Sequence, residues 1–110
     1  MRRVVITGLG TVSPIGNSVD AFWESVLGNK SGIAPIAGFD ASETGVTVAA
    51  EVKDFNAKEV LGRKDSQRMD KFSQFGVAAS KEAVEMSGYD ISSNPFNVGV
   101  MVGSGIGGLH

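Results

Sequence analysis

The first clear pattern in the chain is an amphipathic repeat near its beginning. Apolar residues recur at i, i+3, i+4, i+7 and i+8 from Val19 to Leu27, which is the spacing of one helix face. Asn17 or Ser18 can cap the start of this helix, and Gly28 can end it. The pattern predicts a short helix that buries one side.

A second and longer repeat places apolar residues three and four positions apart from about Ser66 to Ser87. Asp65 or Ser66 is the expected N-cap, and Gly88 is the expected stop. This helix also contains several small residues, which would let a neighbouring backbone approach closely: Gly76, Ala78, Ala79 and Ala83. The pattern therefore predicts a long helix packed deep in a larger body.

Shorter apolar runs predict three strands. Residues 3–7 are a short β-branched run and residues 98–102 are rich in Val, both typical of a buried strand, and residues 47–52 form a weaker candidate. Residues 31–45 are rich in Gly, Ser, Pro and Asp and predict an irregular connection. The order strand, helix, strand, helix, strand predicts an α/β fold.

Composition narrows the class of protein. The 110 residues are 42% hydrophobic, which suits one globular unit at most. They contain no cysteine, so a disulfide framework and a cysteine nucleophile are excluded within this sequence. The net charge of -2 argues against nonspecific nucleic-acid binding. No apolar run is long enough for a signal peptide or a membrane span, and we therefore expect a cytoplasmic protein.

A glycine-rich loop follows the last predicted strand. Gly103, Gly105 and Gly108 satisfy G-x-G-x-x-G, a spacing that can cradle a dinucleotide pyrophosphate. The confirming helix and acidic residue do not follow within the sequence, so a dinucleotide-binding reductase fragment stays an alternative. A buried strand that opens into such a loop normally continues into a helix, and we expect these residues to be part of a longer protein.

Positive charge is concentrated in the middle of the chain. Seven of the ten basic residues lie between residues 53 and 81. On a continuous helix Lys64, Arg68 and Lys71 would share one stripe, with Arg63 beside them. The cluster can receive an acidic partner or a phosphate, or it can be a solvated face.

Other candidate chemistry is sparse. His110 is the only histidine and has no neighbouring residues that would make it a general base. Glu82 and Glu85 lie on the polar face of the long predicted helix. No metal-ligand spacing is present, so we expect no metal site.

Taken together, the chain resembles the N-terminal part of a β-ketoacyl-acyl carrier protein synthase, and most closely the synthase II type. The resemblance covers essentially all 110 residues in collinear order. It is carried by the opening RRVVITGLGTVSPIGNSVDAFWESVLGNKSGI, the middle FDASETGVTVAAEVKDFNAKEVLGRKDSQRMDKFSQFGVAAS and the final VGVMVGSGIGGL.

The resemblance implies a thiolase-like layered α/β fold, of which residues 1–110 would supply only the beginning of the N-terminal half of one incomplete domain. It also implies a decarboxylative Claisen condensation in fatty acid biosynthesis, in which an acyl thioester is extended by malonyl-acyl carrier protein. The family's nucleophilic cysteine and its two histidines would lie beyond residue 110. No catalytic residue is therefore assigned here, and the isolated 110 residues should be inactive.

The resemblance also implies partners and binding residues. Acyl carrier protein would dock on Lys64 and Arg68, with Arg63 and Lys71 as neighbours. Ile106 would lie at the acyl pocket, where Gly105 and Gly107 leave space for the backbone. A homodimer is implied for the complete protein, with no cofactor, nucleic acid or membrane. A noncatalytic carrier-docking module is the remaining alternative.

Overall fold

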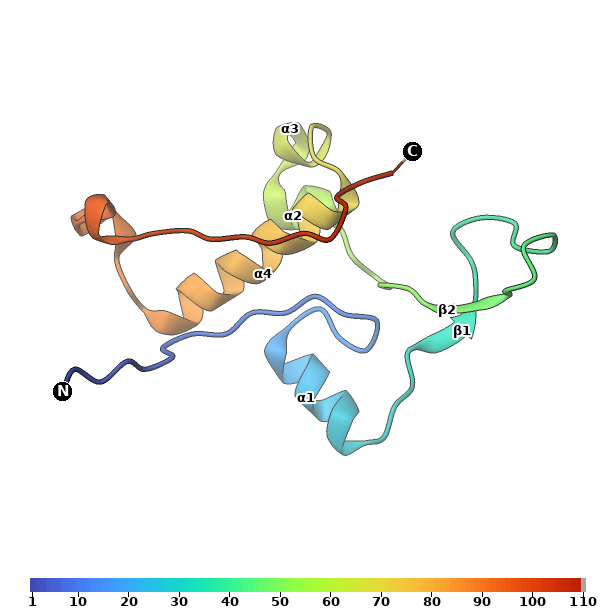
Figure 1. Cartoon of the computed structure of the whole chain (residues 1–110), viewed down its shortest axis with the longest axis horizontal. Coiled ribbons are helices and arrows are strands. Elements are labelled where there is room, and N and C mark those ends of the chain that lie inside the picture. The colour runs from blue at the N-terminus through green and yellow to red at the C-terminus, as the bar shows by residue number, and fades with distance from the viewer. Residues whose placement is uncertain (110) are drawn as a thin grey trace. The chain divides into compact units, whose positions relative to one another are not determined.

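The computed structural model describes residues 1–109, and they form two compact units. One unit joins Met1–Gly10 to the residues from Ala57 onward, and the other is Thr11–Asn56 (Figure 1). The described residues contain both helices and strands, but one helix is followed by two strands and then by three helices, so the predicted order strand, helix, strand, helix, strand is wrong for them.

The unit formed by Thr11–Asn56 begins with helix α1, Val19–Leu27, which confirms the first predicted helix. Its N-cap is Ser18, whose Oγ accepts a hydrogen bond from the backbone N–H of Ala21 at 3.2 Å. At the other end the N–H of Gly28 donates to the carbonyl of Glu24 at 2.9 Å. Both ends are fixed by local hydrogen bonds, which is why the sequence predicts them well.

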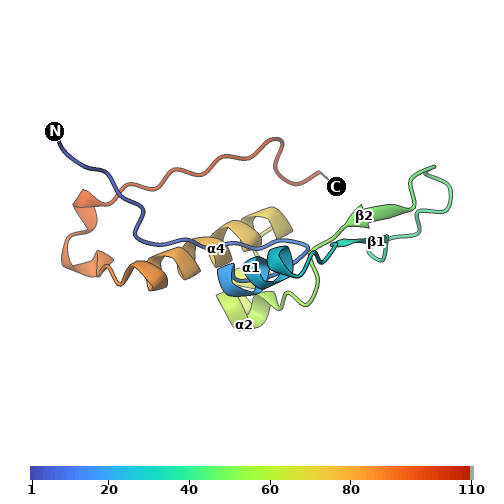
Figure 2. The same ribbon diagram turned by 90° about the horizontal axis from the view of Figure 1, so that it is seen from below.

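Two short strands complete this unit (Figure 2). Strand β1, Ile33–Pro35, pairs antiparallel with strand β2, Val48–Ala50, with Ala34 opposite Ala49. The predicted strand at residues 47–52 is thus confirmed in its centre. The prediction of an irregular connection over residues 31–45 is wrong at β1, because three residues there find a backbone partner that their composition does not reveal.

The other unit is mostly helical. It contains α2 (Ala57–Leu61), α3 (Arg63–Ser66) and α4 (Lys71–Ser87), followed by the 3-10 turns η1 (Ile91–Ser93) and η2 (Pro95–Asn97). The long predicted helix is confirmed from Lys71 to its stop at Gly88, but its predicted start near Ser66 is wrong. Asp70 is the N-cap, with an extended ψ of 159°, and so the chain turns between α3 and α4.

Small residues on α4 lie against the N-terminal segment of the chain. A Cβ added at Gly10 would overlap the carbonyl oxygen of Ala79, and one added at Gly8 would overlap that of Ala83. The N–H of Leu9, between them, donates to the Sδ of Met86 at 3.3 Å. The predicted close approach of a backbone to this helix is therefore confirmed, and it requires glycine on the approaching segment as well.

We expect Gly10→Ala to destabilise a full-length protein that carries this segment by about 1–3 kcal/mol, because the new methyl group has no space beside the α4 backbone. Thermal unfolding measures the effect. Gly99→Ala is the matched control, since open space surrounds Gly99 in the described part of the chain. Equal melting temperatures for the two variants would contradict this packing.

The predicted buried strands at residues 3–7 and 98–102 are wrong for the described residues. Neither segment is assigned to a strand, and β1 and β2 form the one sheet that the structure describes. Val4 is 96% exposed and Met101 is 99% exposed. An apolar run becomes a strand only when another strand pairs with it, and neither segment has such a partner among the described residues.

The apolar core of the described residues is correspondingly small. Ala41 and Ala78 are its buried hydrophobic members, and Ser25 is buried as well. Large apolar side chains such as Trp23 and Phe96 remain exposed. No helix in the described residues is both long and apolar enough to cross a membrane.

Candidate functional site

The predicted basic residues lie close together at the turn between α3 and α4. Arg63 and Lys64 open α3, Arg68 lies in the turn, and Lys71 is the first residue of α4. All four side chains are exposed. Because the helix is interrupted before Asp70, the condition of a continuous helix is not met, and the four residues form a cluster around a turn and not a stripe.

Hydrogen bonds to the backbone hold this basic cluster in shape. The N–H of Arg68 donates to the carbonyl of Asp65 at 3.1 Å. The side-chain amide of Gln74, one turn into α4, donates to the carbonyls of Ser66 at 2.8 Å and Met69 at 3.1 Å. Gln74 therefore ties both sides of the turn to the long helix. Sequence reasoning missed this residue, since a polar side chain within a helix carries no signal of its own.

The chemistry of the basic cluster is that of an anion-binding surface. Its guanidinium and ammonium groups face solvent, where attraction to an anion is screened by salt. Asp65 and Asp70 lie among them and reduce the local positive charge. Such a surface can guide a negatively charged partner into place, and contributes more to the rate of encounter than to final affinity.

The second predicted site is the glycine loop that contains Ile106. The loop turns back on itself, because the N–H of Gly107 donates to the Oγ of Ser104 at 3.0 Å. Ile106 is 78% exposed and Gly105 is exposed, whereas Gly107 is half-buried with a φ of 82°. The structure brings these three residues together at the end of an extended segment.

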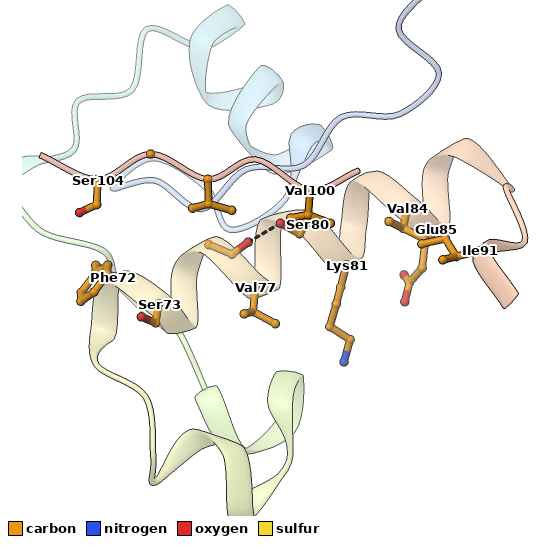
Figure 3. A pocket seen from close by; sticks show the side chains of 13 residues that line it. Phe72, Ser73, Val77, Ser80, Lys81, Val84, Glu85, Ile91, Val100 and Ser104 are labelled. Atoms are coloured by element: carbon orange, nitrogen blue, oxygen red, sulfur yellow. Dashed lines mark hydrogen bonds between the residues drawn. The ribbon is translucent and has the colours of Figure 1, made fainter. Parts of the chain in front are cut away.

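An apolar groove of about 720 Å³ lies between α4 and the extended segment that precedes the glycine loop, residues 100–104 (Figure 3). Phe72, Val77 and Val84 of α4 line it, and Val100, Val102 and Ser104 line it from the other side. The predicted pocket residues Ile106, Gly105 and Gly107 are not among its lining residues, although Gly103 is. Phe72 is one of the apolar residues in the predicted long helix, but helical spacing alone does not reveal that its side chain lines this groove.

The remaining candidates lie elsewhere. His110 is outside the described residues. Among residues 1–109, no three His, Cys, Asp or Glu side chains lie close enough together to hold a metal ion.

Comparisons with known proteins agree with this arrangement of elements. The chain is similar to the 3-oxoacyl-[acyl-carrier-protein] synthase 2 of Coxiella burnetii, with 50% identity over 109 residues, and to that of Vibrio harveyi, with 47%. In each case the match covers 98% of this chain and 26% of the relative, so the chain spans about a quarter of the length of these curated relatives.

A solved structure supports the fold. The ishigamide ketosynthase/chain length factor superposes with a TM-score of 0.75 and 34% sequence identity, covering 83% of this chain and 23% of the other. The thiolase-like α/β fold expected from the resemblance is therefore confirmed for the part that this chain supplies. The family described as Beta-ketoacyl synthase, N-terminal domain matches residues 1–110. The chain therefore belongs to the β-ketoacyl synthase family.

Proposed function

We propose that residues 1–110 form the N-terminal segment of a condensing-enzyme domain, in a 3-oxoacyl-acyl carrier protein synthase of fatty acid biosynthesis. The observation that carries the proposal is the collinear similarity of nearly the whole chain to relatives that bear this name. The chain spans about a quarter of those relatives and contains no cysteine. The nucleophilic cysteine and the two histidines of the family would therefore come from other parts of the full-length protein.

In the proposed reaction the cysteine thiolate attacks the carbonyl of acyl-acyl carrier protein; the bond from this carbonyl to the carrier sulfur breaks, the carrier leaves as its thiol, and the acyl group is held on the cysteine as a thioester. Malonyl-acyl carrier protein then loses carbon dioxide, and the electron pair of the broken bond forms an enolate. The enolate carbon attacks the thioester carbonyl and expels the cysteine thiolate. The product is a 3-oxoacyl carrier protein that is two carbons longer.

The basic cluster would supply part of the docking surface for acyl carrier protein. Lys64 and Arg68 are exposed, Lys64 in α3 and Arg68 in the turn that Gln74 fixes, and Arg63 and Lys71 extend the positive surface. An acidic carrier protein has the charge that such a surface attracts. The cluster thus offers a site of encounter that is independent of the absent catalytic residues.

The loop of Ile106 would supply part of the acyl pocket. A branched apolar side chain between glycines suits a site that must accept or stop a hydrocarbon chain.

The family resemblance also leads us to propose that the full-length protein is a cytoplasmic homodimer.

The test is a condensation assay on the full-length protein that carries this segment. We expect acyl-acyl carrier protein and malonyl-acyl carrier protein to yield a 3-oxoacyl product two carbons longer, detected by mass spectrometry. The synthase 2 of Vibrio harveyi provides the positive control. If no product forms while the control is active, and NADPH binds saturably instead, the reductase alternative would replace this proposal.

A further inference from the structure

The glycine loop that contains Ile106 rests on the first residues of α4. A Cβ added at Gly107 would lie 3.5 Å from the Cζ of Phe72, so the loop passes beside that ring. A Cβ added at Gly108 would overlap the Oδ2 of Asp70 and would lie 2.8 Å from its Cγ. The loop therefore lies directly against Asp70 and Phe72.

Both supporting residues are themselves fixed by the helix. Asp70 is the N-cap of α4, and its carbonyl accepts a hydrogen bond from the N–H of Gln74 at 2.9 Å. Phe72 is in the first turn, where its ring also lines the apolar groove (Figure 3). A displacement of the loop would have to break its contacts with a regular element.

Ile106 lies between two points at which the loop is held. On one side Ser104 accepts the hydrogen bond from the N–H of Gly107. On the other side Gly107 and Gly108 lie against Phe72 and Asp70. Since both points lie within two residues of Ile106, they restrict where its side chain can be presented.

We propose that Asp70 and Phe72 are positioning residues that seat the Ile106 loop and thereby determine which lengths of acyl chain the pocket accepts. The proposal rests on the proposed function, because it assigns Ile106 to the acyl pocket. Neither residue needs to touch the substrate's reacting atoms. They would fix the position of Ile106 in the acyl pocket. A pocket discriminates between acyl chains that differ by two carbons only if the residue that limits its length is held in place.

The contact at Gly108 allows a test by substitution and rescue in the full-length protein. In Gly108→Ala the new methyl group overlaps the Asp70 carboxylate, and we expect the contact between the loop and α4 to shift. We expect the ratio of kcat/KM for long and short acyl primers to change about fivefold. Asp70→Ala alone removes the carboxylate on which the loop rests and should change the ratio by a similar factor. Asp70→Asn keeps the size and shape of the side chain and should return the ratio to within about twofold of the wild-type value.

A second readout follows the loop directly. Hydrogen exchange of the peptide that covers residues 103–109 should accelerate in Gly108→Ala and in Asp70→Ala, and should stay near the wild-type rate in Asp70→Asn. Phe72→Leu provides an independent variant, which should accelerate exchange in the same peptide and broaden the range of accepted primers. Gly99→Ala is the control, because a Cβ there meets no atom of the described residues within 4 Å.

The outcomes separate this proposal from the proposed function. A wild-type protein that elongates no primer would overturn the proposed function and this proposal with it. An active wild type whose length ratio and loop exchange are unchanged by Gly108→Ala and Phe72→Leu would overturn the seating alone. A wild-type length ratio and wild-type loop exchange in Asp70→Ala would overturn the role of Asp70.

Discussion

Reversing two charges in the basic cluster, by Lys64→Glu together with Arg68→Glu, is expected to raise the KM for acyl carrier protein roughly tenfold at low salt. Exposed ion pairs contribute about 0.2–1 kcal/mol each, and reversal replaces attraction by repulsion of similar size. Both side chains are exposed, so the fold should remain intact. Steady-state kinetics of the full-length protein with varied carrier concentration measure the effect.

Salt and a matched variant make this prediction specific. The difference between variant and wild type should shrink as ionic strength rises, because exposed charges are screened over about 8 Å at physiological salt. Arg2→Glu with Arg3→Glu changes the net charge by the same amount at exposed positions outside the cluster, and should leave the carrier KM near the wild-type value. Equal KM values for the two double variants would refute docking at the cluster.

Local signals explain how much of the fold the sequence predicts. Helix α1 is predicted to within a residue, because Ser18 and Gly28 act on the backbone immediately beside them. The start of α4 is predicted poorly, because Ser66 and Asp70 are both good capping residues. Choosing between them depends on the turn that Gln74 fixes from within the helix.

Strands depend on partners that a local pattern does not reveal. Residues 3–7 and 98–102 have the composition of buried strands, but the described residues pair neither of them. The chain spans only about a quarter of its curated relatives. In contrast, β1 forms within a segment of turn-like composition because Val48–Ala50 pairs with it.

The two candidate sites also differ in how far the sequence predicts them. The basic cluster is visible in the sequence because its members are neighbours along the chain. The support of the Ile106 loop is not visible, because Asp70 and Phe72 are far from Gly107 and Gly108 in sequence and meet only in the folded unit. The family resemblance points to the Ile106 loop, and the structure shows that Asp70 and Phe72 lie beside it.

The largest expected effect on substrate choice is that of Ile106→Phe. The phenyl ring is bulkier than the isoleucine side chain, and in the proposed pocket it would occupy space that the distal carbons of a long primer need. We expect kcat/KM for the longest accepted primers to fall roughly 10- to 100-fold, while short primers lose little, since misfit by a few methylene groups costs about 1–3 kcal/mol. Competition among acyl primers of graded length, with products separated by mass, measures the change.

The exposure of Ile106 makes this experiment a clean one. The side chain is 78% exposed in the structure, so enlarging it should not disturb the packing of the described residues or the melting temperature. A change in length preference would then arise from the pocket and not from partial unfolding.

Ile106→Val is the matched control. It keeps a branched apolar side chain, removes one methyl group and should tolerate every primer that the wild type accepts. Turnover of all primer lengths by Ile106→Phe at wild-type rates would exclude Ile106 from the acyl pocket, whereas a uniform loss at every length would indicate a role in binding or folding that does not depend on chain length.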